Sequence, residues 1–538
     1  MIYHTDNAFN QAMRKCFGSD FAMLCGLGLL KLLLHFYTNQ QYGYFSDEFY
    51  YIAAGDHLEW GFAEGAPLVP AIASLSRWML GDSLFSIRLF PAIVGAFTVI
   101  LTGLIARELG GGRLAQALSA IAAILAPGYL FLHTVLTMNA FEPVLWSGCA
   151  YLVIRIIKTG RVALWGFAGI LAGIGVMNKF SIVFFIASLV TGIYATTSRK
   201  ILFNRWIIIA AILAIVIFAP TILWQIDHGW PFLEHQRESN LYEKKGFAES
   251  TIDLLAQQFI WTNPGAVPLW LGGLYYYLGS PLGKPYRALG WSYLSVLGWF
   301  ILFKGRFYYL FPIYPMLFAA GAVLLEPEMK RRRTWKYAAF ALLLASGLVF
   351  LPVGLPVLPV ETLIRYANAV YRPPSLSRFA DNDLTQAPWH YRIMLGWDEA
   401  VEQIAQAYQK LSPQDRAEAE ILAWSYDYAG AVDLLGVPYH LPKAISGHTG
   451  YYFWGTQNYS GKVMLSLGGD LNFLRQTFDR VELVAVVKHE KSVGIKSDLL
   501  IYLCKDIKRP LPEVWPSFKY YFKLPSENFI TGKGVKAQ

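Results

Sequence analysis

Charged residues are scarce in this chain, and their scarcity excludes an ordinary soluble protein. Of the 538 residues, only 15% are charged, whereas 55% are hydrophobic and 16% are aromatic. Soluble domains carry about 25% charged residues. Together with a mean hydropathy of +0.36, this composition predicts a protein that crosses a membrane many times.

Cysteine is rarer still, with four residues in the whole chain. Cys16 precedes the first apolar run, and Cys25 and Cys149 lie inside apolar runs. Only Cys504 is left for the compartment outside the membrane. We therefore expect neither a disulfide nor a cysteine-based metal site.

The positive net charge does not indicate a nucleic-acid-binding protein, although it amounts to +9. The Lys and Arg residues stand in short clusters between apolar runs, which is typical of cytoplasmic loops. We find no internal repeat, no low-complexity tract and no cleavable signal peptide. The first apolar run, 21–37, is therefore expected to remain as the first span.

Apolar runs close to the length that a bilayer requires recur as far as residue 355. They predict about eleven spans, at 21–37, 85–106, 114–131, 140–157, 162–177, 181–198, 206–225, 266–282, 288–303, 307–325 and 337–355. Short basic loops follow alternate spans, at 107–113, 158–161, 198–205, 283–287 and 328–336. The positive-inside rule places these loops and the N-terminus in the cytoplasm. The loop 38–84 and the chain beyond 355 are then extracytoplasmic.

The sequence changes character beyond residue 355, where charged and amide side chains return. Apolar residues at helical spacing predict a helix over 397–411. Four short apolar segments predict strands, at 421–426, 462–467, 481–487 and 499–504. We expect residues 1–355 to form an α-helical polytopic membrane domain and residues 356–538 to form an extracytoplasmic α/β domain.

The first outer loop, 38–84, is acidic and too long for a simple connection between two spans. Segments 47–60 and 68–80 are each expected to form a short helix on the membrane surface. The second would place its apolar side chains on one face, namely Leu68, Ile72, Leu75 and Met79.

Two adjacent acids, Asp47 and Glu48, open the first of these helices and allow two compatible interpretations. Acids suit the N-terminus of a helix, and Ser46 is a candidate N-cap. An aspartate in this position could also act as a base at the mouth of a membrane cavity.

Residues 47–93 resemble the first loop of bacterial polyprenyl-phosphate-sugar-dependent glycosyltransferases of the GT-C type. These membrane enzymes are related to protein O-mannosyltransferases and to the lipid A aminoarabinose transferase. The shared landmarks are Asp47, Glu48, Tyr50, Tyr51, His57, Leu58, Gly61, Pro67, Arg88 and Leu89. Further segments are similar to the family, at 136–146, 173–181, 224–232, 304–315 and 446–455. Where the family often has Asp-His-Pro-Pro, this chain has "EGAP" from Glu64, so no role of that histidine is carried over.

The resemblance implies an inverting glycosyltransferase of the bacterial inner (plasma) membrane, with its active site and C-terminal domain in the periplasm. It would move a hexose or pentose from a polyprenyl phosphate, such as undecaprenyl phosphate, to a glycolipid such as lipid A, to a glycan or to a protein. The resemblance thus also implies a role in the modification of lipopolysaccharide or another glycolipid. No cofactor is required, although a divalent metal held by Asp47, Glu142 and a histidine is left open.

Phosphate is a good leaving group, so the reaction needs a base for the acceptor and positive charge for the phosphate. Asp47 is the candidate base, and its neighbour Glu48 is the alternative catalytic candidate. In the segment 136–146 an acid is expected, and Glu142 is favoured over Asn139. If the fourth span begins only at Pro143, Glu142 would instead be a solvated loop acid.

The candidate phosphate ligands are Lys179, Lys304 and Arg306, which stand at the outer ends of predicted spans. The alternative is that they are ordinary flanking charges at the membrane interface. Further candidate substrate-binding residues are His57, Glu64, Arg88 and Tyr308. Arg88 could also clamp an acid of the first loop.

Two other classes of protein remain as alternatives. One is a lipid or solute transporter gated by the acidic loop, although the repeats typical of such folds are not evident. The other is an enzyme of the same build that uses diphosphate-linked donors. In the first span, Lys31 and His35 share a face, and a packing partner such as a carboxylate is expected for them.

Overall fold

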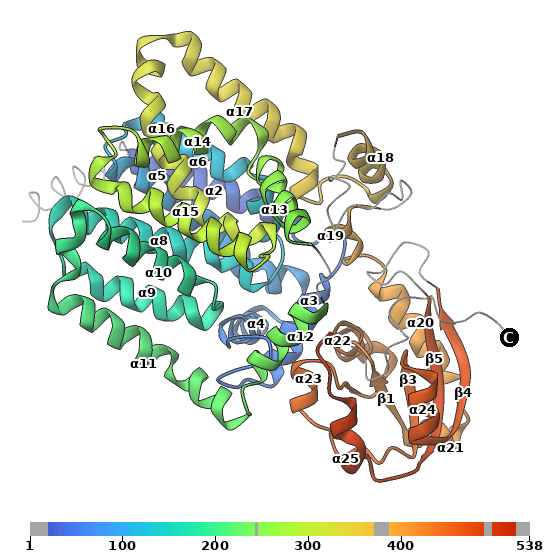
Figure 1. Ribbon diagram of the computed structural model, residues 1–538. Helices are drawn as coiled ribbons and strands as arrows, with labels where there is room; N and C mark the ends of the chain where they lie inside the picture. Colours follow the sequence, from blue (N-terminus) through green and yellow to red (C-terminus); the bar gives the residue numbers. More distant parts are fainter. Residues whose placement is uncertain (1–19, 243–245, 371–386, 489–497, 523–538) are drawn as a thin grey trace, which may run out of the picture. The chain divides into compact units, whose positions relative to one another are not determined.

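The computed structural model describes residues 20–242, 246–370, 387–488 and 498–522, which fall into two compact units. Unit 1 is built from Met1–Gln41, Phe85–Pro220 and Lys245–Asn382. Unit 2 is built from Tyr42–Leu84, Thr221–Lys244 and Asp383–Gln538. Figure 1 labels their helices and strands.

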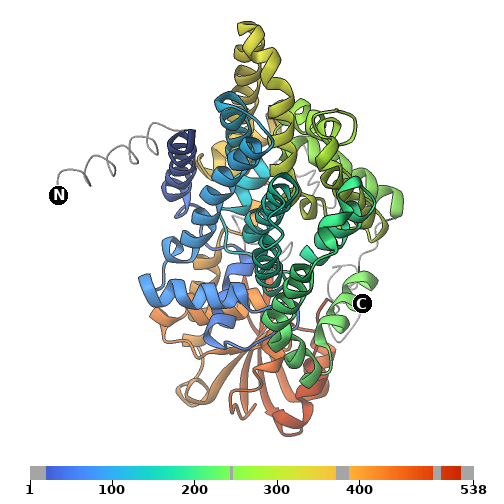
Figure 2. The ribbon, with the colours of Figure 1, turned by 90° about the vertical axis from the view of Figure 1, so that its left-hand side faces the viewer.

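Unit 1 is helical, and every apolar run predicted as a span contains a helix. The helices are α2 (Asp20–Thr38), α5 (Leu84–Glu108), α6 (Arg113–Leu125), α7 (Pro127–Leu132), α8 (Met138–Thr159), α9 (Leu164–Asn178), α10 (Ile182–Tyr194), α11 (Arg205–Asp227), α13 (Phe247–Trp261), α14 (Val267–Leu278), α15 (Arg287–Leu302), α16 (Tyr314–Arg331), α17 (Arg333–Gly354) and α18 (Val360–Val370). Many of them run side by side across Figure 1, and several are seen nearly end-on in Figure 2.

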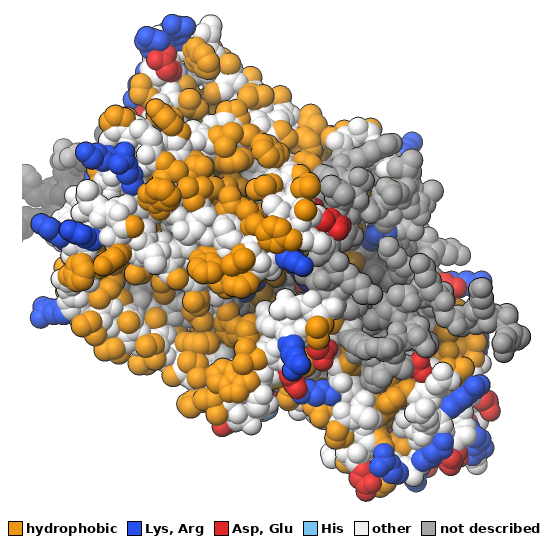
Figure 3. Space-filling view, viewed as in Figure 1, with side chains coloured by type: hydrophobic (Ala, Val, Ile, Leu, Met, Phe, Trp, Pro, Cys, Tyr) orange, Lys and Arg blue, Asp and Glu red, His pale blue; other side chains and the backbone are white. Residues whose placement is uncertain are grey.

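Six helices of the described chain are long and apolar enough to cross a membrane. They are α2, α5, α8, α11, α17 and the continuous segment Phe307–Arg331. The apolar helices α6, α9 and α10 have 13, 15 and 13 residues, which is shorter than the roughly 20 residues of a full span. The number of about eleven spans therefore stays a prediction, while the membrane character of unit 1 is confirmed. In Figure 3, hydrophobic side chains cover most of its visible face.

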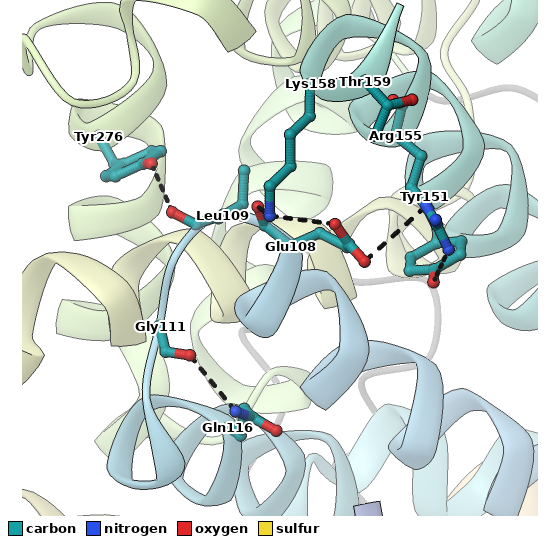
Figure 4. Close-up of polar contacts among 9 residues, drawn as sticks. All are labelled: Glu108, Leu109, Gly111, Gln116, Tyr151, Arg155, Lys158, Thr159 and Tyr276. Atoms are coloured by element: carbon teal, nitrogen blue, oxygen red, sulfur yellow. Dashed lines mark hydrogen bonds and ion pairs between the residues drawn. The ribbon is translucent and has the colours of Figure 1, made fainter. Parts of the chain in front are cut away.

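The predicted basic loops meet at one end of unit 1. Lys158 Nζ, at the end of α8, lies 3.1 Å from Glu108 Oε2 at the end of α5, and Arg155 Nε lies 3.9 Å from the same carboxylate (Figure 4). The backbone N–H of Gly112 donates to Glu326 Oε2 of α16 at 2.7 Å. The end of α5 and the loop after it thus contact both the end of α8 and the last turns of α16.

The basic loops 198–205 and 283–287 contact each other, and the first of them also contacts the start of α9. The hydroxyl of Ser198 donates to the carbonyl of Pro285 at 3.0 Å. The indole N–H of Trp165, just after the loop 158–161, donates to the carbonyl of Ile201 at 3.0 Å. The basic loops that follow alternate predicted spans therefore lie together at one end of the helices of unit 1.

The run predicted as a single span at 114–131 is broken at Ala126, because Pro127 has no N–H to continue the helix. Lys31 is fully buried beside this break, and its Nζ donates to the carbonyls of Ile124 and Tyr129 at 3.4 and 3.3 Å. A packing partner for Lys31 is confirmed, but it consists of two backbone carbonyls rather than a carboxylate. The carbonyl of Tyr129 also accepts the N–H of His133 at 3.3 Å.

The sheet of unit 2 has the order β2-β1-β3-β5-β4. Its strands are β1 (Ala419–Ala423), β2 (Ala444–Ile445), β3 (Val463–Leu467), β4 (Phe478–Val487) and β5 (Leu499–Ile507). β1 pairs in parallel with β2 and β3, whereas β5 pairs antiparallel with β3 and β4. The four predicted strands are confirmed, but the first ends at Ala423 rather than at Tyr426.

Helices complete the C-terminal part of unit 2, and the predicted helix over 397–411 is confirmed as α20 (Trp397–Gln409). The others are α19 (Trp389–Arg392), α21 (Pro413–Glu418), α22 (Tyr426–Leu435), α23 (Gly450–Phe453), α24 (Leu471–Thr477) and α25 (Leu511–Val514). One face of the sheet packs against a core that contains Trp424, Trp515 and Phe518.

The first outer loop folds as α3 (Ser46–Asp56) and α4 (Leu68–Leu80), as predicted. They pack closely, because a Cβ at Gly55 would lie 3.1 Å from the carbonyl oxygen of Pro70. The opposite side of α4 exposes large apolar side chains, including Leu75, Trp78 and Met79. This exposure fits a helix that lies in a membrane interface.

The second segment of unit 2, Thr221–Lys244, contains the end of α11 and all of α12 (Pro231–Tyr242). The side-chain amide of Gln225 donates to the carbonyl of Phe62 at 2.9 Å. Glu234 of α12 forms an ion pair with Lys519. The first outer loop, the loop after α11 and the sheet domain are therefore parts of one unit.

The close contact between α14 and α16 in unit 1 depends on two glycines. A Cβ at Gly321 would lie 1.8 Å from the carbonyl oxygen of Leu269, and one at Gly273 would lie 2.0 Å from that of Leu317. Such small residues let membrane helices approach each other. We predict that Gly321→Val lowers the thermal unfolding midpoint in detergent, because overpacking typically costs about 1–3 kcal/mol.

The matched control is Gly298→Val on α15, where an added Cβ would meet nothing within 4 Å. Its unfolding midpoint should stay close to that of the wild type. Equal midpoints for the two variants would show that the α14–α16 contact does not require Gly321.

Candidate active site

The two adjacent acids at the start of α3 have different surroundings, because successive helical residues point about 100° apart. Glu48 is fully buried, and its carboxylate accepts the backbone N–H of Phe45 at 2.7 Å. Phe45 is the N-cap residue, so the prediction of Ser46 in that role is wrong. Glu48 thus closes the first turn of the helix, while Asp47 is half-buried and faces another partner.

That partner is Tyr426, the first residue of α22. Its hydroxyl donates to Asp47 Oδ1 at 2.7 Å. Burial, followed by the charge of Asp47, raises the pKa of Tyr426 well above its usual value, so the phenol remains a donor. The candidate base is thus fixed by a side chain from the C-terminal domain.

Glu64 is a second acid in this part of unit 2, and both of its carboxylate oxygens are buried. They face the hydroxyl of Tyr50 without a well-aligned hydrogen bond. Burial raises the pKa of Glu64 to about 7, and the nearby charge of Asp47 acts in the same direction. Near neutral pH, Glu64 is therefore able to take up or give up a proton.

Asp427 is a further acid of unit 2, and it follows Tyr426 in the first turn of α22. Its carboxylate accepts the backbone N–H of Tyr428 at 2.8 Å and is bonded to the hydroxyl of Ser425. Burial raises the pKa of Asp427 to about 7, again with a contribution from Asp47. Within the described residues, no group of three or more His, Cys, Asp or Glu side chains is arranged to hold a metal ion.

Aromatic residues of α23 and the turn after it pack against the first outer loop. The ring of His57 stacks on Trp454, with ring centroids 4.5 Å apart and planes inclined by 9°. Gly450 makes room for Tyr50, since a Cβ at Gly450 would lie 2.2 Å from the hydroxyl oxygen of Tyr50. The segment 446–455 therefore belongs to the same site as the first loop.

A second charged centre lies in unit 1, around Lys179. Its Nζ lies 3.1 Å from Glu142 Oε2 and 2.7 Å from Asn139 Oδ1, and Ser181 is hydrogen-bonded to the same carboxylate. Glu142 lies inside α8 with 2% of its surface exposed, which excludes a solvated loop acid. Both candidates from the segment 136–146 thus face Lys179, which is not an exposed flanking charge.

A third segment completes this centre. Lys179 Nζ lies 4.0 Å from the ring centroid of Tyr309 and 5.8 Å from that of Tyr308. Arg306 donates to the hydroxyl of Tyr308 at 3.0 Å. Lys304 is half-buried in the same turn, with a positive φ of 52°. Segments separated by more than a hundred residues therefore place cations, acids and aromatic rings together.

Arg88 has a different position from these residues. It is fully buried in α5, and its guanidinium donates to the carbonyl of Asn39 at 2.8 Å and to that of Gln41 at 3.4 Å. These contacts attach the end of α2 to α5. Its predicted contact with substrate stays a prediction.

The predicted site residues fall into two groups. Asp47, Glu48, His57 and Glu64 belong to unit 2, whereas Glu142, Lys179, Lys304, Arg306 and Tyr308 belong to unit 1. Each group is brought together within its own unit. The roles of Lys179, Lys304 and Arg306 as phosphate ligands and of Asp47 as the base stay predictions.

Sequence reasoning missed Tyr426 and Asp427, because the strand was expected to continue through Tyr426. A signal was available, since functional residues of α/β folds often follow the carboxyl end of a parallel strand. Tyr426 stands three residues after the end of β1. Tyr309 was also missed, although it adjoins the candidate Tyr308.

We predict a pH-dependent gain in stability for Glu64→Gln. The unfolded carboxyl has a pKa near 4.5 and the folded one about 7, so the folded state binds more protons between these values. Its stability therefore falls as pH rises through this window, and the cost of the buried charge is fully present only above it. The neutral amide should raise the unfolding midpoint at about pH 8 and much less at about pH 4.5.

The control is Glu402→Gln, on the exposed side of α20. Its effect on the unfolding midpoint should be small at both pH values. If Glu64→Gln raised the unfolding midpoint equally at the two pH values, the assignment of Glu64 as a buried acid with a raised pKa would be contradicted.

Comparisons with known proteins concern the fold of the chain and its family resemblance. Residues 64–224 match the family model described as dolichyl-phosphate-mannose-protein mannosyltransferase. A comparison with curated proteins gives no match. The crystal structure of ArnT from Cupriavidus metallidurans bound to undecaprenyl phosphate is similar with a TM-score of 0.59 and 14% identity, over 89% of this chain and 97% of that chain.

The apo state of ArnT from the same organism gives a TM-score of 0.56 and 14% identity, over 90% of this chain and 97% of that chain. These matches show that the chain has the GT-C fold. They confirm its resemblance to the glycosyltransferases that are related to protein O-mannosyltransferases and ArnT.

Proposed function

We propose that this chain is an integral-membrane glycosyltransferase that moves a sugar from a polyprenyl-phosphate donor to an acceptor hydroxyl outside the cytoplasm. The donor lipid is of the undecaprenyl-phosphate class. The acceptor is a glycolipid such as lipid A, a glycan or a protein. The enzyme acts at the outer face of the bacterial inner membrane, with the C-terminal domain in the periplasm, and requires no cofactor.

The observation that carries the proposal is the charged centre of unit 1. Lys179, Glu142 and Arg306 come from three separate segments of a membrane-embedded fold, and two of the three lie within the matched family segment 64–224. Ionised groups in such a region are costly and are kept mainly for function. A phosphate group held there would be neutralised by Lys179 and Arg306.

The reaction is a displacement at the anomeric carbon of the sugar. The acceptor oxygen forms a bond to that carbon, and the bond from the carbon to the phosphate oxygen breaks. The electron pair of the broken bond leaves with the polyprenyl phosphate, and the proton of the acceptor hydroxyl passes to Asp47. Attack from the face opposite the phosphate inverts the configuration.

We predict that Asp47→Asn lowers kcat by about 10²–10⁴-fold in full-length protein supplied with a polyprenyl-phosphate sugar, because the amide cannot accept the proton. The measurement is the rate at which free polyprenyl phosphate and glycosylated acceptor appear. The control is Asp82→Asn, which removes an exposed acid that pairs with Arg77 at the end of α4. Unchanged turnover of Asp47→Asn would remove Asp47 from the reaction.

We predict that Lys179→Gln raises the KM for the donor about 10-fold or more, because one charge-assisted contact to the phosphate is lost. The matched control is Lys158→Gln, whose ammonium pairs with Glu108 at the end of unit 1 that carries the basic loops. If the wild-type protein moves the donor lipid between the two leaflets of a liposome but transfers no sugar, the result would favour a transporter instead.

A further inference from the structure

Tyr426 enters the site from the carboxyl end of β1. The strand ends at Ala423, and three residues later α22 begins at Tyr426 with Ser425 as its N-cap residue. The phenol then reaches Asp47 Oδ1 at 2.7 Å, across 379 positions of sequence. Both residues belong to unit 2.

The ring of Tyr426 is held in place by His448. The two rings stack with centroids 4.9 Å apart, and His448 stacks in turn on Tyr520 at 4.6 Å. His448 Nδ1 accepts the backbone N–H of Tyr426 at 3.1 Å, so its proton lies on Nε2, which donates to the carbonyl of Tyr521 at 2.8 Å. Burial lowers the pKa of His448 to about 4, which keeps this neutral tautomer in place.

A close approach of two helices sets the distance between Tyr426 and Asp47. A Cβ at Gly430 would lie 2.7 Å from the Cβ of Phe49, so a glycine in α22 allows it to pack directly on α3. Gly430 stands one helical turn after Tyr426, on the same face. The pairing of Tyr426 with Asp47 is thus built into the helix packing.

The phenol also offsets the repulsion among neighbouring acids. The titratable groups that interact with Asp47 include Tyr426 and Asp427 of α22 and Glu64 of the turn before α4. Carboxylates crowded together disfavour ionisation of one another. A hydrogen bond donated to Asp47 favours its charged form and fixes one of its two oxygens.

We propose that Tyr426 is a positioning residue for Asp47, so that the C-terminal domain supplies part of the catalytic centre. The inference rests on the proposed function. The hydrogen bond from the phenol to Oδ1 holds the carboxylate that would accept the proton in one orientation. Asp47 remains ionised at a lower pH than it would without the phenol.

The test is Tyr426→Phe in the full-length protein with a polyprenyl-phosphate sugar. We expect kcat to fall about 10–100-fold with little change in the donor KM. The acidic limb of the pH profile of kcat should move to higher pH, because the ionised carboxylate loses a donor. Tyr408→Phe is the matched control, since its hydroxyl donates to the carbonyl of Arg416 beside a different hydrophobic cluster.

A double variant separates positioning from a general loss of structure. In the background of Asp47→Asn, Tyr426→Phe should cause no further loss, because the carboxylate that it orients is already gone. A fluorinated tyrosine at position 426 keeps the ring and hydroxyl but is a stronger donor, so it should move the acidic limb to lower pH.

Two results would overturn the inference while leaving the proposed function intact. One is a pH profile of kcat that neither substitution at position 426 moves. The other is an equal loss for Tyr426→Phe in the presence and absence of the Asp47 carboxylate. Absence of sugar transfer by the wild type would instead contradict the proposed function itself.

Discussion

A charge in the interior of a protein is stable only beside a partner, and both charged centres of this chain obey that constraint. Lys179 is matched by Glu142 and Asn139, and Asp47 is matched by the phenol of Tyr426. In each case the partners stand on different elements. The packing of those elements therefore determines whether each charged side chain has a partner at its position.

Unit 2 illustrates how backbone geometry produces such a match. Glycines stand where two segments come into contact, at Gly430 against Phe49 and at Gly450 against Tyr50. A larger side chain at either position would separate the C-terminal domain from α3. The domain is therefore part of the same structural unit as the acidic loop, and its aromatic residues form part of the surroundings of that loop.

The acids of unit 2 stand in different environments. Glu64 and Asp427 are buried, and their pKa values of about 7 lie far above those of free carboxyls. Glu48 is instead committed to the backbone of its own helix. Buried carboxyls with raised pKa values, such as Glu64 and Asp427, are typical of functional sites.

The positions of the helices and of four strands followed from the sequence, because apolar periodicity is a local property of the chain. Glu64, Glu142 and Lys179 were likewise identified as candidates from residue type and position alone. Only the tertiary structure decided that Asp47 rather than Glu48 meets Tyr426, and that carbonyls rather than a carboxylate receive Lys31. These contacts join residues about a hundred or several hundred positions apart, and no pattern within one segment specifies which distant segment will pack against it.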